Sequence, residues 1–266
     1  MKKLFKALFA ILRNPWLLNN VLSDDSVWNR YILKIHEFTN GLSLLDINLI
    51  CPDFSETLEC FAFLDGGSLP TDIALLKSLS KKVESCKYFE IGTWRGESVV
   101  NVAENAAECY TLNLSKEELQ SLGLSDRYAD NHGLFSKGKK NIIHLTGNSL
   151  TFDYQSLDKK FDLIFIDGDH HYDFVKSDTE NIFRHLVHDK SIVVWHDYGF
   201  QADKIRYEVM AAILDGVGSE RAPLVYHVAH TKCAIYTGKK MSAASVDFPI
   251  VPEAYFNMEI SRHTNK

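Results

Sequence analysis

Between about residue 71 and residue 238, short apolar runs alternate with longer segments in which apolar residues recur every three or four positions. The short runs predict buried strands, and the three- to four-residue recurrence predicts amphipathic helices. The predicted strands are Tyr88–Ile91, Glu108–Leu112, Asn141–Leu145, Phe161–Ile166, Ser191–Trp195, Leu224–Val228 and Cys233–Tyr236. The first predicted helix is capped by Thr71 or Asp72 and runs through Ile73, Leu75, Leu76 and Leu79. The other predicted helices cover Ser98–Ala107, a segment opened by the capping box Ser115–Glu118, a segment whose apolar face runs from Val175 to Leu186, and Ile205–Leu214.

The strand–helix alternation indicates a parallel sheet with helices on both faces. The last two strands are joined only by His230-Thr231-Lys232, a linker of hairpin length, so this pair must be antiparallel. We therefore expect an α/β, Rossmann-like sheet of seven strands. It is mostly parallel, closes with a C-terminal antiparallel hairpin, and follows an N-terminal helical extension. A Gly/Pro cluster ending at Pro70 marks a boundary. The expected organisation is an extension or cap over 1–70, a Rossmann-like domain over 71–240 and a tail over 241–266.

The first 13 residues combine lysines with apolar residues. Lys6 interrupts the apolar stretch and no small-x-small cleavage site follows before Pro15, so the segment does not match a secretory signal. Apolar residues at helical spacing (Leu4, Leu8, Ile11 and Leu12) predict an amphipathic helix. We expect it to pack on the body or a partner subunit, and weak contact with a membrane surface is the alternative. No apolar run is long enough to span a bilayer.

Composition narrows the classes of function. The net charge of −6 argues against a nucleic-acid binder, which needs a Lys/Arg surplus to displace counterions from phosphates. The five cysteines are widely spaced and form no C-x-x-C pair, so neither a zinc site nor a disulfide framework is predicted. A reducing, cytoplasmic compartment fits this cysteine usage. The sequence leaves homo-oligomerisation open.

The end of the first strand carries the clearest motif, Glu90-Ile-Gly-Thr-Trp-Arg-Gly-Glu-Ser98. Gly92 allows a sharp turn and close approach of a ligand, and Gly96 allows the next helix to start against the sheet. A dinucleotide site needs a second glycine where Trp94 stands, and an acid beside the turn repels a diphosphate. Glu90 suits a cationic ligand better, which disfavours an NAD-linked oxidoreductase.

This segment resembles the glycine-rich motif of class I S-adenosylmethionine-dependent methyltransferases. The resemblance is closest to the family that includes bacterial sugar and macrolide O-methyltransferases, and it covers roughly residues 71 to 238. It implies S-adenosylmethionine as cofactor and a small hydroxylated molecule, sugar or glycan as methyl acceptor. The side chains and turn residues that it implies for cofactor binding are Glu90, Gly92, Thr93, Gly96, Ser98, Asn113, Asn148, Ser149 and Asp167.

The second and third strand ends carry amides. Asn113 follows Glu90 at about the 20-residue spacing at which such enzymes usually place an acid for the ribose hydroxyls. A neutral amide bond is roughly half as strong as a charge-assisted one. This departure is the main sequence feature in favour of a non-catalytic cofactor-binding or assembly protein. The resemblance places Asn148 and Ser149 beside the adenine, and a plain turn is the alternative role of Asn148.

The fourth and fifth strands end in Asp167-Gly-Asp169 and His196-Asp197. Adjacent parallel strands end side by side, so we expect Asp167, Asp169, His196 and Asp197 to converge within a few ångströms. Carboxylates with an imidazole form a candidate site for Mg²⁺ or another divalent cation. The resemblance implies Asp167 and Asp197 as ligands, with His196 where an acid is more usual. A polar cluster that only shapes the cofactor pocket is the alternative.

The implied reaction is in-line attack of an acceptor oxygen on the sulfonium methyl, which requires a base beside that oxygen. Asp169 is the expected base if a cation is bound, because the cation lowers the pKa of the hydroxyl. Without a cation, His170 is the better base.

Overall fold

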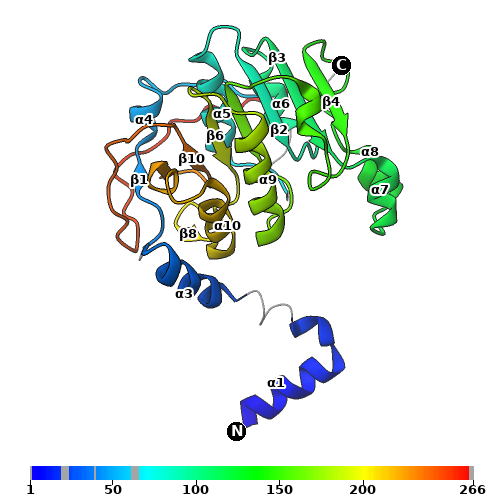
Figure 1. Ribbon diagram of the computed structural model, residues 1–266, viewed down its shortest axis with the longest axis vertical. Helices are drawn as coiled ribbons and strands as arrows, with labels where there is room; N and C mark the ends of the chain where they lie inside the picture. The colour runs from blue at the N-terminus through cyan, green and yellow to red at the C-terminus, as the bar shows by residue number, and fades with distance from the viewer. Residues whose placement is uncertain (1, 19–23, 39, 61–65, 264–266) are drawn as a thin grey trace.

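The computed structural model describes residues 2–18, 24–38, 40–60 and 66–263; the remaining positions of the predicted extension and tail lie outside the described residues. The described chain contains an eight-stranded sheet, ordered β1-β9-β10-β6-β5-β2-β3-β4, and a two-stranded hairpin of β7 and β8 (Figure 1). The strands are β1 (Leu44–Leu45), β2 (Lys87–Ile91), β3 (Glu108–Asn113), β4 (Ile142–Thr146), β5 (Leu163–Ile166), β6 (Ile192–Trp195), β7 (Gly199–Gln201), β8 (Lys204–Ile205), β9 (Val225–Val228) and β10 (Ala234–Tyr236).

Helices cover both faces of the large sheet and extend beyond it (Figure 1). They are α1 (Lys2–Arg13), α3 (Asp25–Ile35), α4 (Ile47–Ile50), α5 (Pro70–Lys81), α6 (Glu97–Val102), α7 (Lys116–Ser121), α8 (Asp126–Asp130), α9 (Tyr172–His185) and α10 (Tyr207–Val217). Short 3-10 turns lie at η1 (Pro15–Leu17), η2 (Tyr154–Leu157) and η3 (Ala222–Leu224).

Two apolar cores, one on each face, follow from the alternation of side chains along the strands. In β2, Phe89 and Ile91 pack with α9 and α10, whereas Tyr88 packs with α5 and α6. The buried strand β5 divides in the same way, and Phe165 lies on the α5 side. The domain therefore has three layers, with the sheet packed between helices on either face.

The predicted Rossmann-like fold is confirmed. All seven predicted strands are present within two residues of their expected bounds, and β10 is antiparallel to both β6 and β9. The eighth strand, β1, comes from the N-terminal segment and pairs in parallel with β9, which the sequence did not predict. A two-residue strand has no periodic pattern of its own, so only its sheet neighbour reveals it. The helix over residues 98–107 is shorter than expected and ends at Val102.

The N-terminal helix is exposed, whereas part of the C-terminal tail packs on the body of the protein. α1 has no buried residue and stands away from the body, so the expected packing of this helix against its own chain is wrong (Figure 1). The C-terminal tail has no helix over 239–263, but Ala244 forms a bridge with Leu44 and Val246 is buried. None of the helices in the described residues combines the length and the apolar character needed to cross a bilayer.

Candidate active site

The turn after β2 brings two strand ends into contact. Gly92 has φ +92°, and a Cβ there would lie 1.9 Å from the backbone carbonyl oxygen of Asp167. Its N–H donates to the carbonyl of Leu112 at 2.9 Å. Gly92 is therefore required because the backbone after β5 approaches it, which is a reason independent of any ligand. Gly96, at φ +86°, is the N-cap residue of α6, and a Cβ there would lie 2.3 Å from Oγ of Ser136.

Glu90 is fully buried, and its carboxylate accepts hydrogen bonds from the hydroxyls of Tyr88, Ser98 and Thr111. Burial raises its pKa from the ordinary 4.5 to about 7, although the three hydroxyls oppose this rise. Strand alternation explains the placement, because Glu90 shares its face of the sheet with Tyr88 and points toward α6. The sequence placed this carboxylate at an open strand end. The structure instead makes Glu90 and Ser98 internal supports of the turn.

Thr93 and Trp94 complete this turn. Thr93 is buried and hydrogen-bonds Thr111. Trp94 has φ +39° and packs against the rings of Tyr128 and His132, with centroids 4.6 and 5.1 Å away. The segment that carries α8 therefore docks directly on the turn after β2, a contact between residues far apart in the sequence.

The ends of β3 and β4 meet, because the N–H of Gly147 donates to the carbonyl of Asn113 at 2.9 Å. The Asn113 amide donates to the carbonyl of Leu114 at 3.0 Å. The side-chain oxygen of Asn148 accepts from the N–H of Leu150 at 3.0 Å, which is a local turn bond, and the Ser149 carbonyl accepts from Tyr154. Asn113, the ribose candidate, thus lies at the end of β3, and the adenine candidates Asn148 and Ser149 follow the end of the neighbouring strand β4. Their binding roles stay predictions.

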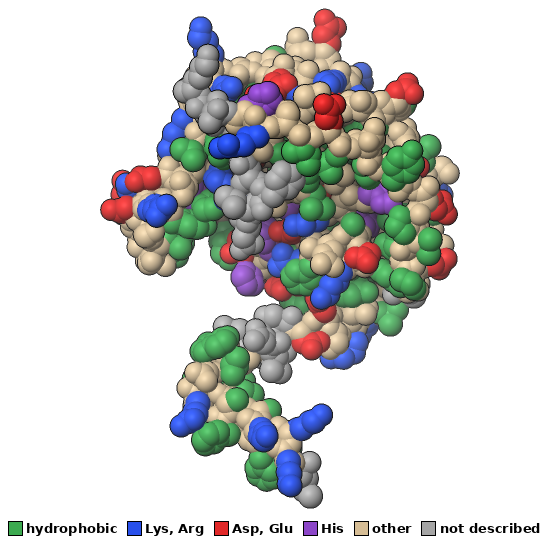
Figure 2. Space-filling model, turned by 180° about the vertical axis from the view of Figure 1, so that it is seen from behind, with side chains coloured by type: hydrophobic (Ala, Val, Ile, Leu, Met, Phe, Trp, Pro, Cys, Tyr) green, Lys and Arg blue, Asp and Glu red, His purple; other side chains and the backbone are tan. Residues whose placement is uncertain are grey.

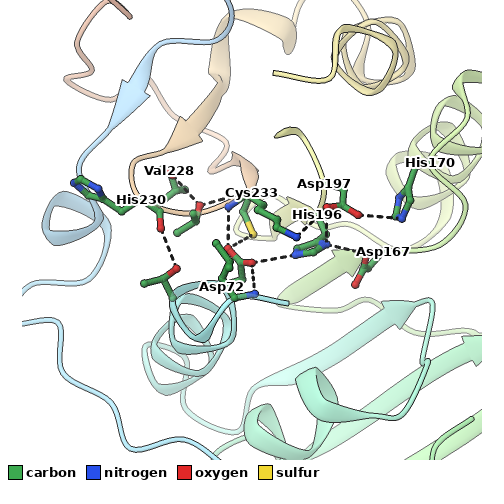
Figure 3. Close-up of polar contacts among 12 residues, drawn as sticks. Asp72, Asp167, His170, His196, Asp197, Val228, His230 and Cys233 are labelled. Carbon is green, nitrogen blue, oxygen red and sulfur yellow. Dashed lines mark hydrogen bonds and ion pairs between the residues drawn. The ribbon is translucent and has the colours of Figure 1, made fainter. Parts of the chain in front are cut away.

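Three of the four residues expected to converge do so (Figure 3). One ligand atom from each of Asp167, His196 and Asp197 lies within 4.8 Å of the others, the one such group of three found among the described residues. Nδ1 of His196 is 3.1 Å from Asp167 Oδ1 and 3.6 Å from Asp197 Oδ1. This group is called the acidic-histidine cluster below.

Asp72 lies behind the acidic-histidine cluster, on the opposite side of the His196 ring from Asp167 (Figure 3). Its side chain is fully buried in the first turn of α5, and its Oδ2 is 3.0 Å from His196 Nε2. The same carboxylate accepts from the backbone N–H groups of Leu69 at 2.7 Å and Lys232 at 2.9 Å. Asp72 therefore accepts the Nε2 proton of His196 and fixes the orientation of the ring.

From the sequence, Asp72 was only a candidate cap of its helix. The helix in fact begins at Pro70, and Asp72 bonds the N–H of Leu69, so a capping contact does exist. Its contact with His196 spans 124 positions. An acid in the first turn of a helix is common, and nothing local distinguishes this one.

Basic side chains surround Asp197. Its carboxylate lies 3.0 Å from Nε2 of His170 and 3.6 Å from Nζ of Lys232. Burial alone raises the pKa of Asp197, but His196, His170 and Lys232 outweigh it and hold that pKa below its ordinary value. For His196, burial alone lowers the pKa, but the carboxylates of Asp167, Asp197 and Asp72 raise it well above its ordinary value.

Asp169 does not join the cluster, so its expected convergence with Asp167, His196 and Asp197 is wrong. Its Oδ1 accepts from the backbone N–H of His171 at 2.8 Å and lies 2.5 Å from the ring Nδ1 of the same residue. This tight local turn at the start of α9 holds the carboxylate. His170 is the side chain of this loop that contacts the cluster.

The donor set fits a bound cation. With the Nε2 proton directed to Asp72, a neutral His196 presents the lone pair of Nδ1 to two carboxylates. This Nδ1 is buried and makes no hydrogen bond to any of the described residues. Three acceptors that face one another need a positive charge between them, which is either a proton on Nδ1 or a divalent ion. Mg²⁺ or a softer divalent ion matches these oxygen and nitrogen donors.

Comparison with known proteins gives a family match over part of the chain. Residues 89–198 match the family described as "Methyltransferase domain". No curated protein matches the sequence. Among solved structures, an SAH-bound methyltransferase of Podospora anserina is 18% identical, with a TM-score of 0.47 over 65% of this chain and 80% of that chain. Cofactor-bound Rv0187 from MTB is 16% identical, with a TM-score of 0.41 over 66% of this chain and 84% of that chain.

Proposed function

We propose that this chain, whose residues 89–198 match a methyltransferase-domain family, is a class I S-adenosylmethionine-dependent enzyme that transfers a methyl group to a hydroxyl of a small molecule, sugar or glycan. One observation carries the proposal. Because Gly92 abuts the backbone of Asp167, the turn that resembles a cofactor site lies directly beside the acidic-histidine cluster. A cofactor at the turn would therefore have cation-binding and proton-accepting groups next to it.

S-adenosylmethionine supplies an electrophilic methyl on a sulfonium when it is bound. In this chain, Gly92 to Gly96 provide a backbone turn, and Glu90 with Ser98 and Thr93 hold that turn rigid from inside the sheet. Asn113 offers a side-chain oxygen at the neighbouring strand end, because its amide nitrogen is already engaged with Leu114. We assign Asn113 to the ribose, and Asn148 and Ser149 to the adenine side.

Asp167, His196 and Asp197 would hold a divalent cation, with Asp72 orienting the imidazole from behind. Such a cation lowers the pKa of an acceptor hydroxyl. Lys232 compensates part of the cluster's negative charge through its contact with Asp197. The chain's own groups therefore prepare a site in which an oxygen can be held and deprotonated.

His170 is the base that the geometry favours. Its Nε2 lies 3.0 Å from Asp197 Oδ2, so an N–H at that position donates to the carboxylate and leaves Nδ1 to accept a proton from the acceptor hydroxyl. Asp169 is the second candidate. Its carboxylate is held by His171, and it must release that ring before it can act on a hydroxyl.

The experiment that tests the function is calorimetric titration of the full chain with S-adenosylmethionine and S-adenosylhomocysteine, with Mg²⁺ or with EDTA. Binding of both compounds and no thermal shift with NADH is the expected result. Absence of binding under all conditions contradicts the assignment. A third outcome is that the cofactor binds but no methyl group is transferred to any of a panel of hydroxylated small molecules and glycans. This outcome favours the non-catalytic alternative, which the amide at Asn113 also favours.

Once an acceptor is found, two neighbouring variants separate the candidate bases. His170→Gln is expected to lower kcat by roughly 100-fold or more, as loss of a general base does. Asp169→Asn removes a carboxylate of the same loop and is the matched control, expected to retain activity within a few-fold. The reverse order of effects transfers the role of base to Asp169.

A further inference from the structure

Helix α1 has two chemically opposite faces. At 3.6 residues per turn, its large apolar side chains fall within about 160° of arc. They are Leu4, Phe5, Leu8, Phe9, Ile11 and Leu12. All four cations of the helix fall on the opposite face: Lys2, Lys3, Lys6 and Arg13. The helix contains no acidic residue, although the whole chain carries a net charge of −6.

The apolar face of α1 has no partner within the described chain. No residue of the helix is buried, and the side chains of Phe5, Phe9 and Leu12 are 69%, 60% and 79% exposed. Figure 2 shows this helix standing off the body with its apolar and basic side chains in the open. Trp16, in the turn that follows, is 64% exposed. A contiguous exposed apolar surface of this kind marks an interaction site.

We propose that α1 lies in the surface of an anionic lipid bilayer, with its apolar face among the acyl chains and its cations among the headgroups. Charge selects this occupant, because residues 2–18 contain four cations and no acid. The breadth of the apolar arc supports it, since a helix pair needs only a narrow seam. Trp16 adds an amphipathic ring of the type that favours the membrane interface. This inference is independent of methyl transfer.

The shortness of the helix gives a second reason. An isolated helix of about 12 residues is marginal in water, because nucleation is costly and few hydrogen bonds repay it. α1 makes no core contact that would stabilise it. An apolar interface supplies the missing stabilisation, so the helical content of this segment should rise when lipid is added.

The test is sedimentation of the full chain with vesicles of phosphatidylcholine alone and of phosphatidylcholine with phosphatidylglycerol at three to one. Partitioning onto the anionic vesicles is expected to exceed partitioning onto the neutral ones by at least about tenfold and to fall with salt. Lys3→Gln and Lys6→Gln are each expected to weaken it by about fivefold. Equal partitioning onto both vesicles, or none onto either, overturns the proposal.

Two matched double variants locate the contact on the apolar face. Phe5→Gln with Leu8→Gln is expected to weaken partitioning by roughly 100-fold or more, since two large apolar side chains are removed. Ala7→Gln with Ala10→Gln adds the same two glutamines on the other face and is expected to bind within about twofold of the parent chain. Thermal unfolding midpoints of all three proteins should agree, because α1 is outside the core.

Two results contradict the membrane assignment. The first is equal partitioning of both double variants. The second is a concentration-dependent dimer in light scattering without vesicles that only Phe5→Gln with Leu8→Gln abolishes, together with no sedimentation on lipid. That second result assigns the face to another copy of the chain.

Discussion

Glu90 is fully buried and the Asp197 side chain is 20% exposed; both are carboxylates at the ends of central strands, yet their pKa values shift in opposite directions. Glu90 meets three hydroxyls, and burial raises its pKa to about 7. Burial pushes the pKa of Asp197 in the same direction, but two imidazoles and Lys232 hold it below its ordinary value. Neutral hydroxyls do not offset the complete burial of Glu90, whereas charged and imidazole partners outweigh the less complete burial of Asp197. Glu90 is therefore suited to support the turn, and Asp197 to bind a cation.

The sharpest test of this comparison is removal of the ionised carboxylate. Asp197→Ala is expected to weaken Mn²⁺ binding by more than roughly 100-fold, because it removes a proposed metal ligand and not a side chain that only orients one. Electron paramagnetic resonance measures the Mn²⁺ affinity. Affinity for S-adenosylhomocysteine should stay within a few-fold of the parent value. Asp169→Ala is the control, since that carboxylate lies outside the cluster. If cofactor affinity falls while Mn²⁺ affinity stays within a few-fold, the cluster holds the cofactor and not an ion.

The second test changes Glu90, the carboxylate whose pKa is raised. The folded pKa of Glu90, about 7, lies above its ordinary value of 4.5, so between these values the folded chain keeps a proton that the unfolded chain releases. Stability contributed by this proton is present at low pH and is lost as the pH rises through about 7. Glu90→Gln should remove that loss and raise the free energy of unfolding at pH 8 by on the order of 3 kcal/mol.

Urea unfolding at pH 5 and pH 8 measures this effect. The parent should lose stability between the two values more steeply than Glu90→Gln does. Equal slopes for both proteins mean that Glu90 is ionised in the folded state throughout, which removes its contrast with Asp197.

The third test acts on the cluster from behind. Asp72→Asn keeps the shape of the side chain but weakens the hold on His196 Nε2, and is expected to lower Mn²⁺ affinity by about 10- to 100-fold. Asp46→Asn is the control, because Asp46 also serves a helix start, as the N-cap of α4. Similar Mn²⁺ affinities for the two variants assign Asp72 to folding alone.

The smallest expected effect comes from giving a further strand end the carboxylate that it lacks. Asn113→Asp should strengthen S-adenosylhomocysteine binding by about 1 kcal/mol in a calorimetric titration, if a charge-assisted bond replaces a neutral one. Weaker binding shows that the Asn113 amide is needed as a donor, consistent with its contact with Leu114.

Much of the site's location was available from local pattern. Apolar runs predict the strands, and the polar residues that follow them predict that Asp167, His196 and Asp197 lie at one edge of the sheet, where the structure has them. Alternation along β2 also implies that Glu90 shares a face with Tyr88, as their hydrogen bond shows. Asp169 could not be placed this way, because its bond to His171 depends on the loop conformation.

The sequence by itself determined the α/β layering, the antiparallel end of the sheet and the convergence of three strand-end residues, because each follows from periodicity or from strand adjacency. Only the tertiary structure decided the rest. The pairing of β1 with β9, the contact of Asp72 with His196 and the approach of Asp167 to Gly92 join residues far apart in the chain. The free state of α1 belongs with these, since an amphipathic pattern specifies that one face avoids water but not what covers it.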